Sequence, residues 1–320
     1  MTPSWVKTLS NVFLCLLLGV GSYLLVKYFC LFGLELWQVE RKILQIFYDP
    51  IIGRFQYVIF TIAFWVALVL TLALERLMPA RPQQRTLSLS FAQDLVWFFY
   101  EGILHALIIA SYVSLLRQDY EKYFSGLTIT YVNQFPGWMK FLFALLLLDF
   151  LYWLQHYLNH KVPLFWVFHQ IHHSQKELNF FTDFRYHVLE YIVRQTCLVI
   201  PFLILEVNPP KIVAFAIFQT WYTRFYHGNI RTNLGPLRYI LVTPQSHRIH
   251  HSLEKRHSET NFGSLFCIWD FLFRVQYAGF DEYPETGIND HDFPDEKSER
   301  VTDLFFTPLR QMLYPFRVIE

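Results

Sequence analysis

The chain has 320 residues, of which 53% are hydrophobic, 19% aromatic and only 17% charged. Soluble globular domains carry about 25% charged residues, so this composition, with a mean hydropathy of +0.25, indicates a membrane protein. The formal net charge of +1 gives no support for a nucleic-acid-binding surface.

Several apolar runs approach the length of about 20 residues that a helix needs to cross a bilayer. They cover residues 11–33, 56–78, 96–116 and 138–156, followed by a shorter pair at 188–206 and 211–227. We interpret the run from Val12 to Leu34 as a retained membrane anchor, because it is longer than a signal-peptide core and no A-x-A cleavage pattern follows it.

The shorter pair is divided by VNPPK (207–211), whose two prolines force a turn. Glu190, Arg194 and Arg224 lie within the pair, so it forms either two full spans or a re-entrant hairpin. The sequence therefore predicts an all-α integral membrane protein with four to six apolar helical segments.

Basic residues favour one orientation of these segments. Arg76, Arg81 and Arg85 follow the second run and favour a cytoplasmic loop there, although Lys27 and Arg41 lie on the opposite side. With four spans, the region after residue 156 is cytoplasmic, and we expect it to form a helical cap. We divide the chain into N-terminal transmembrane helices (1–137), a central domain (138–275) and a polar C-terminal tail (276–320).

Twelve of the 13 histidines lie at or after residue 156, and eight of them form three clusters. The clusters are His156 and His160 in HYLNH; His169, His172 and His173 in HQIHHS; and His247, His250 and His251 in HRIHHS. On a helix, residues at i and i+4 lie about 40° apart, and i+3 lies about 60° to the other side. Each cluster therefore points its imidazoles in nearly one direction, and three such helix ends can surround more than one metal ion.

Imidazole ligands suit zinc, iron, copper or nickel, but a structural zinc needs only four ligands. The number of histidines at a membrane face suggests two irons held mainly by nitrogen. Asp149 shares a helical face with His156 but lies about 10 Å away along the axis, at 1.5 Å per residue. We therefore expect Asp149 to orient a ligand from another segment.

The order HxxxH, HxxHH, HxxHH, between apolar spans, resembles the fatty acid hydroxylase and sterol desaturase superfamily over about residues 138–275. FRYHVLE (184–190) is similar to the R-x-H-P-x-E segment of that superfamily, with Val188 in place of proline. HGNIR (227–231) resembles its H-x-N stretch, and NFGSLFCIWDFLF (261–273) resembles its segment ending in W-D-x-x-F.

The resemblance implies a non-haem di-iron oxidoreductase that uses O₂ to oxidise a C–H bond of a sterol, fatty acid or related lipid. It implies the eight clustered histidines as ligands and adds His187 and His227. It also suggests Asp270 as a hydrogen-bonding partner of a ligand imidazole or as a helix cap. His105, His257 and His291 match no ligand position, and His257 is expected to be exposed among charged neighbours.

The reaction needs two electrons per turnover, and the sequence has no G-x-G-x-x-G fingerprint for a flavin or nicotinamide cofactor. We therefore expect an external donor, a small cytochrome or a ferredoxin with its reductase, docking near Arg248, Lys255 and Arg256. The expected location is a multi-pass membrane position with the active site on the cytoplasmic side, in the endoplasmic reticulum of a eukaryote or the inner membrane of a bacterium.

Two alternatives stay open at this stage. Within the enzyme class, hydroxylation, desaturation and stepwise methyl oxidation all fit the residues. Outside it, a membrane metal-binding or metal-transport protein without redox catalysis also uses paired histidines. A transporter would place them near the bilayer midplane between inverted repeats, and the sequence has no such repeat.

Overall fold

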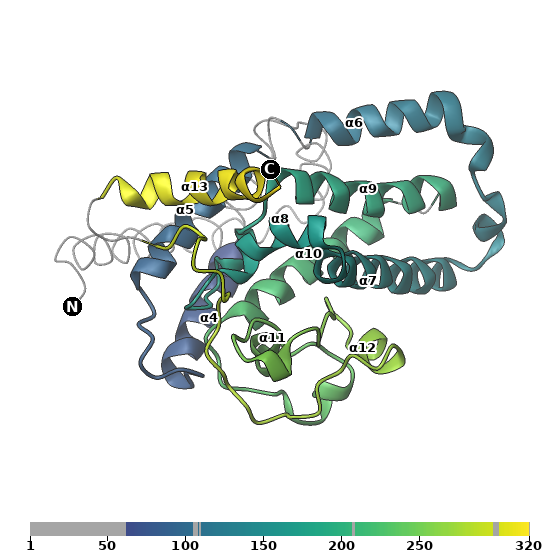
Figure 1. Cartoon of the computed structure of the whole chain (residues 1–320). Helices are drawn as coiled ribbons and strands as arrows, with labels where there is room; N and C mark the ends of the chain where they lie inside the picture. The colour runs from purple at the N-terminus through teal and green to yellow at the C-terminus, as the bar shows by residue number, and fades with distance from the viewer. Residues whose placement is uncertain (1–61, 105–107, 109, 207–208, 297–300, 320) are drawn as a thin grey trace, which may run out of the picture.

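The computed structural model describes residues 62–104, 108, 110–206, 209–296 and 301–319, and the regular elements in this part of the chain are helices (Figure 1). The predicted anchor at 12–34 lies outside the described residues. The α-helices are α4 (Ile62–Leu77), α5 (Leu89–Leu104), α6 (Ala110–Asp119), α7 (Gly137–Lys161), α8 (Pro163–His173), α9 (Val188–Leu205), α10 (Pro209–His227), α11 (Pro244–His250), α12 (Ile268–Leu272) and α13 (Asp303–Val318). Short 3₁₀ or π turns connect them at Tyr120–Phe124, Ser125–Leu127, Thr130–Gln134, Thr182–Phe184, Gly235–Tyr239 and Lys255–His257.

Two described helices, α7 and α9, are long and apolar enough to cross a membrane. They agree closely with the predicted runs at 138–156 and 188–206. The predicted run at 96–116 differs, because α5 ends at Leu104 and the helix that starts at Ala110 is polar, with the sequence ASYVSLLRQD. Four to six spans therefore remain a prediction, and two are candidates in the described part.

Aromatic packing holds α4 and α5 against the segment that follows α8. Phe64, Phe91, Phe98, Phe181 and Phe184 are all buried in one cluster. Some of their rings meet edge to face, as between Phe98 and Phe184, whose centroids are 4.7 Å apart. Such pairs add about 0.5–1.5 kcal/mol each to the free energy gained by burial. This cluster joins α4 and α5 to the segment between α8 and α9.

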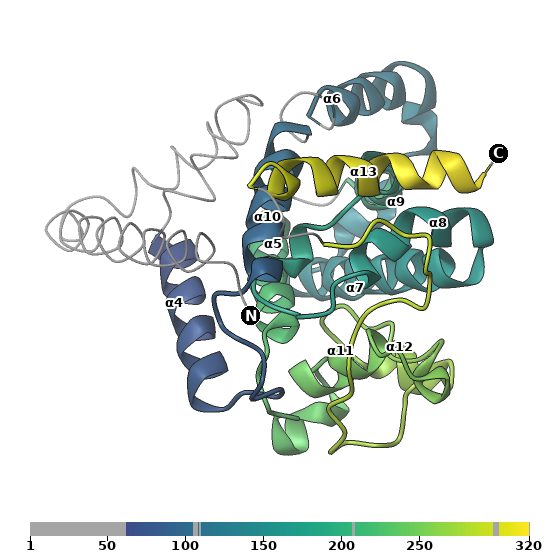
Figure 2. The same cartoon turned by 60° about the vertical axis from the view of Figure 1, so that its left-hand side comes forward.

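The break between α7 and α8 follows directly from the sequence HKVP. A residue before proline is disfavoured in the α region, and Val162 adopts an extended conformation with ψ of 114°. Pro163 then occupies the first turn of α8, where its missing N–H costs nothing. The chain reverses at this point, and α8 packs back on α7 (Figure 2).

Residues of the predicted polar tail include a helix, α13, that packs on α5 and α8. A buried ion-pair network fixes the segment before it. Arg185 is fully buried and pairs with Asp94 of α5 and with Glu296. The tail is therefore tied to the same helices that support the histidines.

Candidate metal centre

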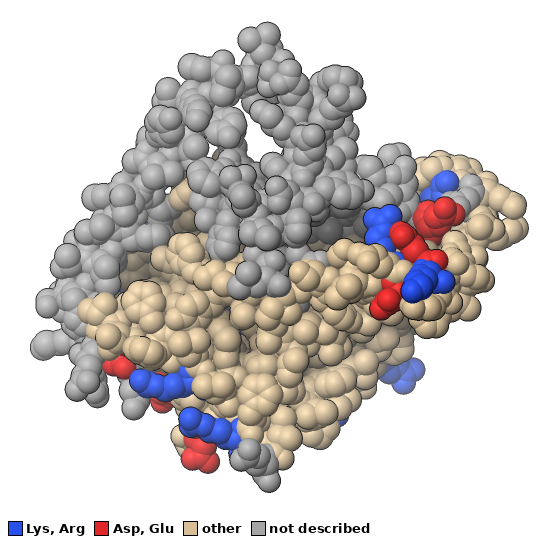
Figure 3. Space-filling model, turned by 90° about the horizontal axis from the view of Figure 1, so that it is seen from above, with Lys and Arg blue, Asp and Glu red and all other residues tan. Residues whose placement is uncertain are grey.

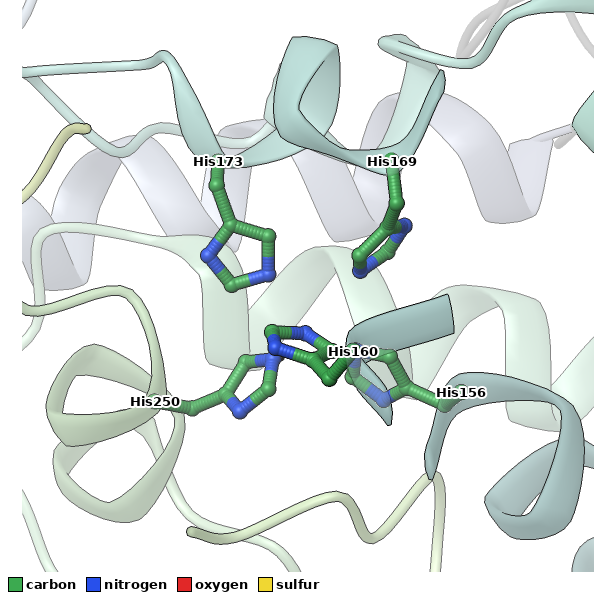
Figure 4. A group of neighbouring side chains, drawn as sticks. All are labelled: His156, His160, His169, His173 and His250. Atoms are coloured by element: carbon green, nitrogen blue, oxygen red, sulfur yellow. Dashed lines mark hydrogen bonds between the residues drawn. The ribbon is translucent and has the colours of Figure 1, made fainter. Parts of the chain in front are cut away.

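Nine histidines converge between α7, α8, α10 and α11. One ring nitrogen from each lies within 4.8 Å of the others in its group. Group A contains His156, His160, His169, His173 and His250, and group B contains His172, His227, His247 and His251. In group A, His169 and His173 approach from α8, opposite His156, His160 and His250 (Figure 4).

The two H-x-I-H-H-S stretches divide their histidines between the groups in opposite ways. In α8, His169 and His173 belong to group A and His172 to group B. In the second stretch, His247 and His251 belong to group B and His250 to group A. The histidine at i+4 points in nearly the same direction as the first histidine, whereas the histidine at i+3 is rotated about the helix axis toward the other group. The repeated motif therefore delivers two imidazoles to one group and one to the other, with the roles exchanged.

The isoleucine of each motif points away from the centre. Ile171 and Ile249 are both fully buried. Ile171 packs with Trp97, Phe293 and Tyr314. The apolar side of each turn thus fixes its orientation, as expected from the sequence.

A capping box begins the short helix α11. The Thr243 hydroxyl accepts a hydrogen bond from the Ser246 N–H at 3.0 Å, and the Ser246 hydroxyl accepts one from the Thr243 N–H at 2.9 Å. Pro244 occupies the first turn. These features stabilise a helix of seven residues that carries His247 and His250.

Backbone carbonyls define which ring nitrogen faces inward. His156 Nδ1 lies 3.1 Å from the Phe262 carbonyl oxygen, and His250 Nδ1 lies 2.8 Å from that of Thr260. Each Nδ1 must therefore carry the proton that it donates, which leaves each Nε2 with a bare lone pair. Yet the two Nε2 atoms lie only 2.9 Å apart. Two bare lone pairs at this distance repel each other unless a cation lies between them.

In group B, a backbone carbonyl orients one ring in the same way. His227 Nδ1 lies 2.7 Å from the Thr223 carbonyl oxygen, so its Nε2 is also bare. That Nε2 lies 2.8 Å from Nε2 of His247 and 3.2 Å from Nε2 of His172. Metal–imidazole bonds of about 2.0–2.1 Å place neighbouring donors at right angles about 2.9 Å apart, so both groups fit a metal ion.

Burial keeps these imidazoles neutral, which is the form that binds metal. Burial, and then the neighbouring histidines, lower the pKa of His172, His173, His247 and His251 well below the ordinary value. Burial also lowers the pKa of His250 to about 3. Among the described residues, Nε2 of His160, His169 and His173 has no hydrogen-bond partner, so these atoms too are available as ligands.

Glu190 has a role that the sequence did not suggest. Its Oε1 lies 2.8 Å from His169 Nδ1 and accepts a hydrogen bond of 2.8 Å from Asn159 Nδ2. All three side chains are buried. A carboxylate on Nδ1 fixes the ring orientation and makes Nε2 a better donor to metal. Glu190 is the last residue of FRYHVLE, the segment that resembles the family pattern. Only the packing of α8 on α9 shows that its partner is His169.

His187 lies outside both groups. It caps α9, where its Nδ1 accepts a hydrogen bond from the Leu189 N–H at 3.1 Å. Its ring also bonds to the Met312 backbone and contacts Phe168 and Phe316. The structure therefore brings together nine of the ten histidines predicted as ligands, and His187 serves as a helix cap because its ring faces α13.

Asp149 and Asp270 support the centre through a loop. Asp149 accepts hydrogen bonds from the Leu265 N–H and the Trp269 indole, both at 2.9 Å. Asp270 accepts from the N–H groups of Phe262 and Gly263, also at 2.9 Å. These bonds hold the loop whose Phe262 carbonyl orients His156. The expected bond from either aspartate to an imidazole is absent among the described contacts.

Two expectations about the cap are wrong. His257 is buried and not exposed, because Ser252 and Glu282 cover it and its Nδ1 lies 2.8 Å from the Ser252 hydroxyl. Arg248 is also buried, with its guanidinium donating to Asn229 Oδ1 at 3.1 Å, so it cannot meet a docking partner. His291 is exposed, and His105 lies outside the described residues.

Residues 141–275, which contain all nine histidines, match the sequence model of the fatty acid hydroxylase family. This segment belongs to the fatty acid hydroxylase superfamily. The hydroxylase segment includes α8, α9, α10, α11 and α12 in full and most of α7.

Several curated relatives match the same part of the chain. Human alkylglycerol monooxygenase is 33% identical over 130 residues, which cover 41% of this chain and 29% of that protein. The ornithine lipid hydroxylase of Rhizobium tropici is 29% identical over 140 residues, 44% of this chain and 42% of that protein. A zebrafish cholesterol 25-hydroxylase-like protein is 26% identical over 156 residues, 45% of this chain and 60% of that protein. No solved structure matches the chain.

Proposed function

We propose that this protein is an O₂-dependent lipid hydroxylase whose nine histidines hold two iron ions. The observation that carries the proposal is the division of the imidazoles into groups of five and four, with the bare Nε2 atoms of His156 and His250 only 2.9 Å apart in group A. The relatives named as monooxygenases or hydroxylases of lipids support the choice of reaction.

The donor set favours iron over a structural zinc. A structural zinc site is closed by four ligands, whereas group A alone offers five nitrogens. No cysteine belongs to either group. Two such ions, held by these histidines, would supply activation of O₂ toward an unactivated C–H bond. One oxygen atom then enters the product as an alcohol, and the other leaves as water with two electrons and two protons from a donor.

The protein contributes orientation and exclusion of water. Carbonyl oxygens on Nδ1 of His156, His250 and His227, and Glu190 on His169, hold the rings in one tautomer and direction. His169, His172, His173, His227, His247, His250 and His251 are all buried. Holding the reacting groups in a dry, fixed geometry is the main contribution of a protein around such a cofactor.

The substrate class follows from the relatives and from the membrane helices. The names of the relatives specify an alkylglycerol, an ornithine lipid and a sterol-type reaction, so we assign a membrane lipid as substrate and hydroxylation over desaturation. We place the centre on the cytoplasmic side of the membrane, at the C-terminal end of α7. Lys255 and Arg256, which are exposed beside α11, are the proposed contact for an external electron donor.

The first experiment measures metal in the purified full chain. Reconstitution with iron under argon, followed by Mössbauer spectroscopy, should give two irons per chain with a coupled diferric signal after oxidation. A lipid screen with a reducing system should then yield a hydroxylated product. A chain that binds a single zinc and refuses iron would overturn the proposal and favour metal binding or transport without redox catalysis.

A further inference from the structure

Helix α13 is amphipathic in the direction opposite to that of a helix on a soluble protein. Its polar side faces inward: Gln311 and Tyr314 are buried. Gln311 accepts a hydrogen bond from the Trp97 indole at 3.2 Å and donates to the Pro294 carbonyl at 2.9 Å. Tyr314 donates to Asp290 at 2.7 Å. These two polar side chains are thus held by hydrogen bonds within the protein.

The apolar side of α13 faces outward. Phe305, Phe306, Leu309, Leu313 and Phe316 follow helical spacing along one stripe, and each is between 40% and 55% exposed. A soluble helix would bury such a stripe and expose its polar side. A contiguous exposed apolar stripe indicates an interaction surface.

The stripe continues onto neighbouring helices. α13 packs on α5 and α8, and the Tyr100 hydroxyl of α5 donates to the Phe305 carbonyl at 3.0 Å. Phe99 and Ile103 of α5 and Leu189 at the start of the candidate span α9 are also exposed. Figure 3 views this face from above. Where the described residues are visible, a broad area of the surface has no charged side chains, and the charged side chains gather at its margins.

We propose that α13 lies in the surface of the lipid bilayer, with its stripe among the acyl chains. The continuity with a candidate membrane span favours a bilayer over a soluble partner or a second copy of the chain. Arg310 and Arg317, both exposed on the same helix, suit phosphate headgroups, since long basic side chains extend from an apolar face toward the polar layer. The inference does not depend on the identity of the metal or the reaction.

This position brings the membrane next to the helix that carries three of the metal ligands. The Phe316 ring contacts Phe168 and His187, with centroids 6.0 and 5.5 Å apart. Phe168 directly precedes His169 in α8. The proposed membrane surface therefore lies next to α8.

Photocrosslinking of the full chain in lipid nanodiscs tests the proposal. p-Benzoylphenylalanine replaces Phe306 or Leu313 in discs of phosphatidylcholine and phosphatidylglycerol at three to one, and replaces Glu254 as a control exposed in the polar cap. After irradiation, mass spectrometry should detect lipid adducts at Phe306 and Leu313 at least tenfold above Glu254. Unchanged metal content of each variant would show that it is folded.

Three outcomes would overturn the proposal. An adduct of twice the chain mass would assign the stripe to a second copy. Adducts to peptides of this same chain would assign it to another of its segments. Equal, low lipid labelling at Leu313 and at Glu254 would place the stripe in water.

Discussion

Replacement of Glu190 tests whether a carboxylate outside the ligand set controls metal affinity. Glu190→Ala removes the acceptor that lies 2.8 Å from both His169 Nδ1 and Asn159 Nδ2. Loss of a partner that orients a ligand lowers metal affinity 10- to 100-fold, or about 1.4–2.7 kcal/mol. Two buried donors are also left unpaired, at a cost of about 1–3 kcal/mol each in folding free energy.

Glu190→Gln separates orientation from folding, because its amide oxygen can still accept from His169. We expect Gln to lose less than about tenfold in affinity, since only the charge is removed. Competition for Fe²⁺ against a chromophoric chelator under argon gives the affinity, and thermal unfolding of the metal-free chain gives the stability. Wild-type affinity in a folded Glu190→Ala protein would refute the reasoning, and so would equal losses for Ala and Gln.

Three further sets of substitutions have defined outcomes. His172→Ala and His250→Ala each remove one donor from a different group, so each should reduce tightly bound iron from two ions toward one and abolish product formation. The control, His291→Ala at an exposed position, should leave iron content and product formation unchanged. Full iron loading of either of the first two variants would contradict the grouping. Asp270→Asn puts an amide N–H where a carboxylate oxygen accepts backbone hydrogen bonds, so thermal unfolding should show a loss of about 1–3 kcal/mol, and an unchanged midpoint would contradict it. Gly263→Ala places a Cβ 2.7 Å from a valine methyl and 2.9 Å from a carbonyl oxygen. Thermal unfolding should therefore show a loss of about 1–3 kcal/mol in the free energy of unfolding from overpacking. Wild-type stability would refute this prediction.

The histidines were predictable because their arrangement is local. Spacings of three and four residues determine which side of a helix each ring occupies, so one turn of sequence defines one set of ligands. Assignment to two groups was not predictable, because it depends on how α8 and α11 face each other. The pairing of Glu190 with His169 likewise depends on the packing of α9 against α8.

The errors arose where a distant segment covers a locally polar one. His257 has charged neighbours in sequence and Arg248 is itself charged, yet the segment that contains Glu282 and Pro284 contacts both. The acidic composition of residues 281–303 also concealed α13. Its stripe of phenylalanines and leucines begins only at Phe305, and the helix contains prolines at 308 and 315, the residue type with the lowest helix propensity.

The exchanged roles of the two H-x-I-H-H-S motifs have a consequence for assembly of the centre. Since α8 and α11 each supply donors to both groups, an ion in either group links these two helices and orders the other group at the same time. The second ion then meets ligands already in place and binds with less loss of conformational freedom. Metal uptake should therefore be cooperative, so that chains with one ion are rarer than independent binding would give.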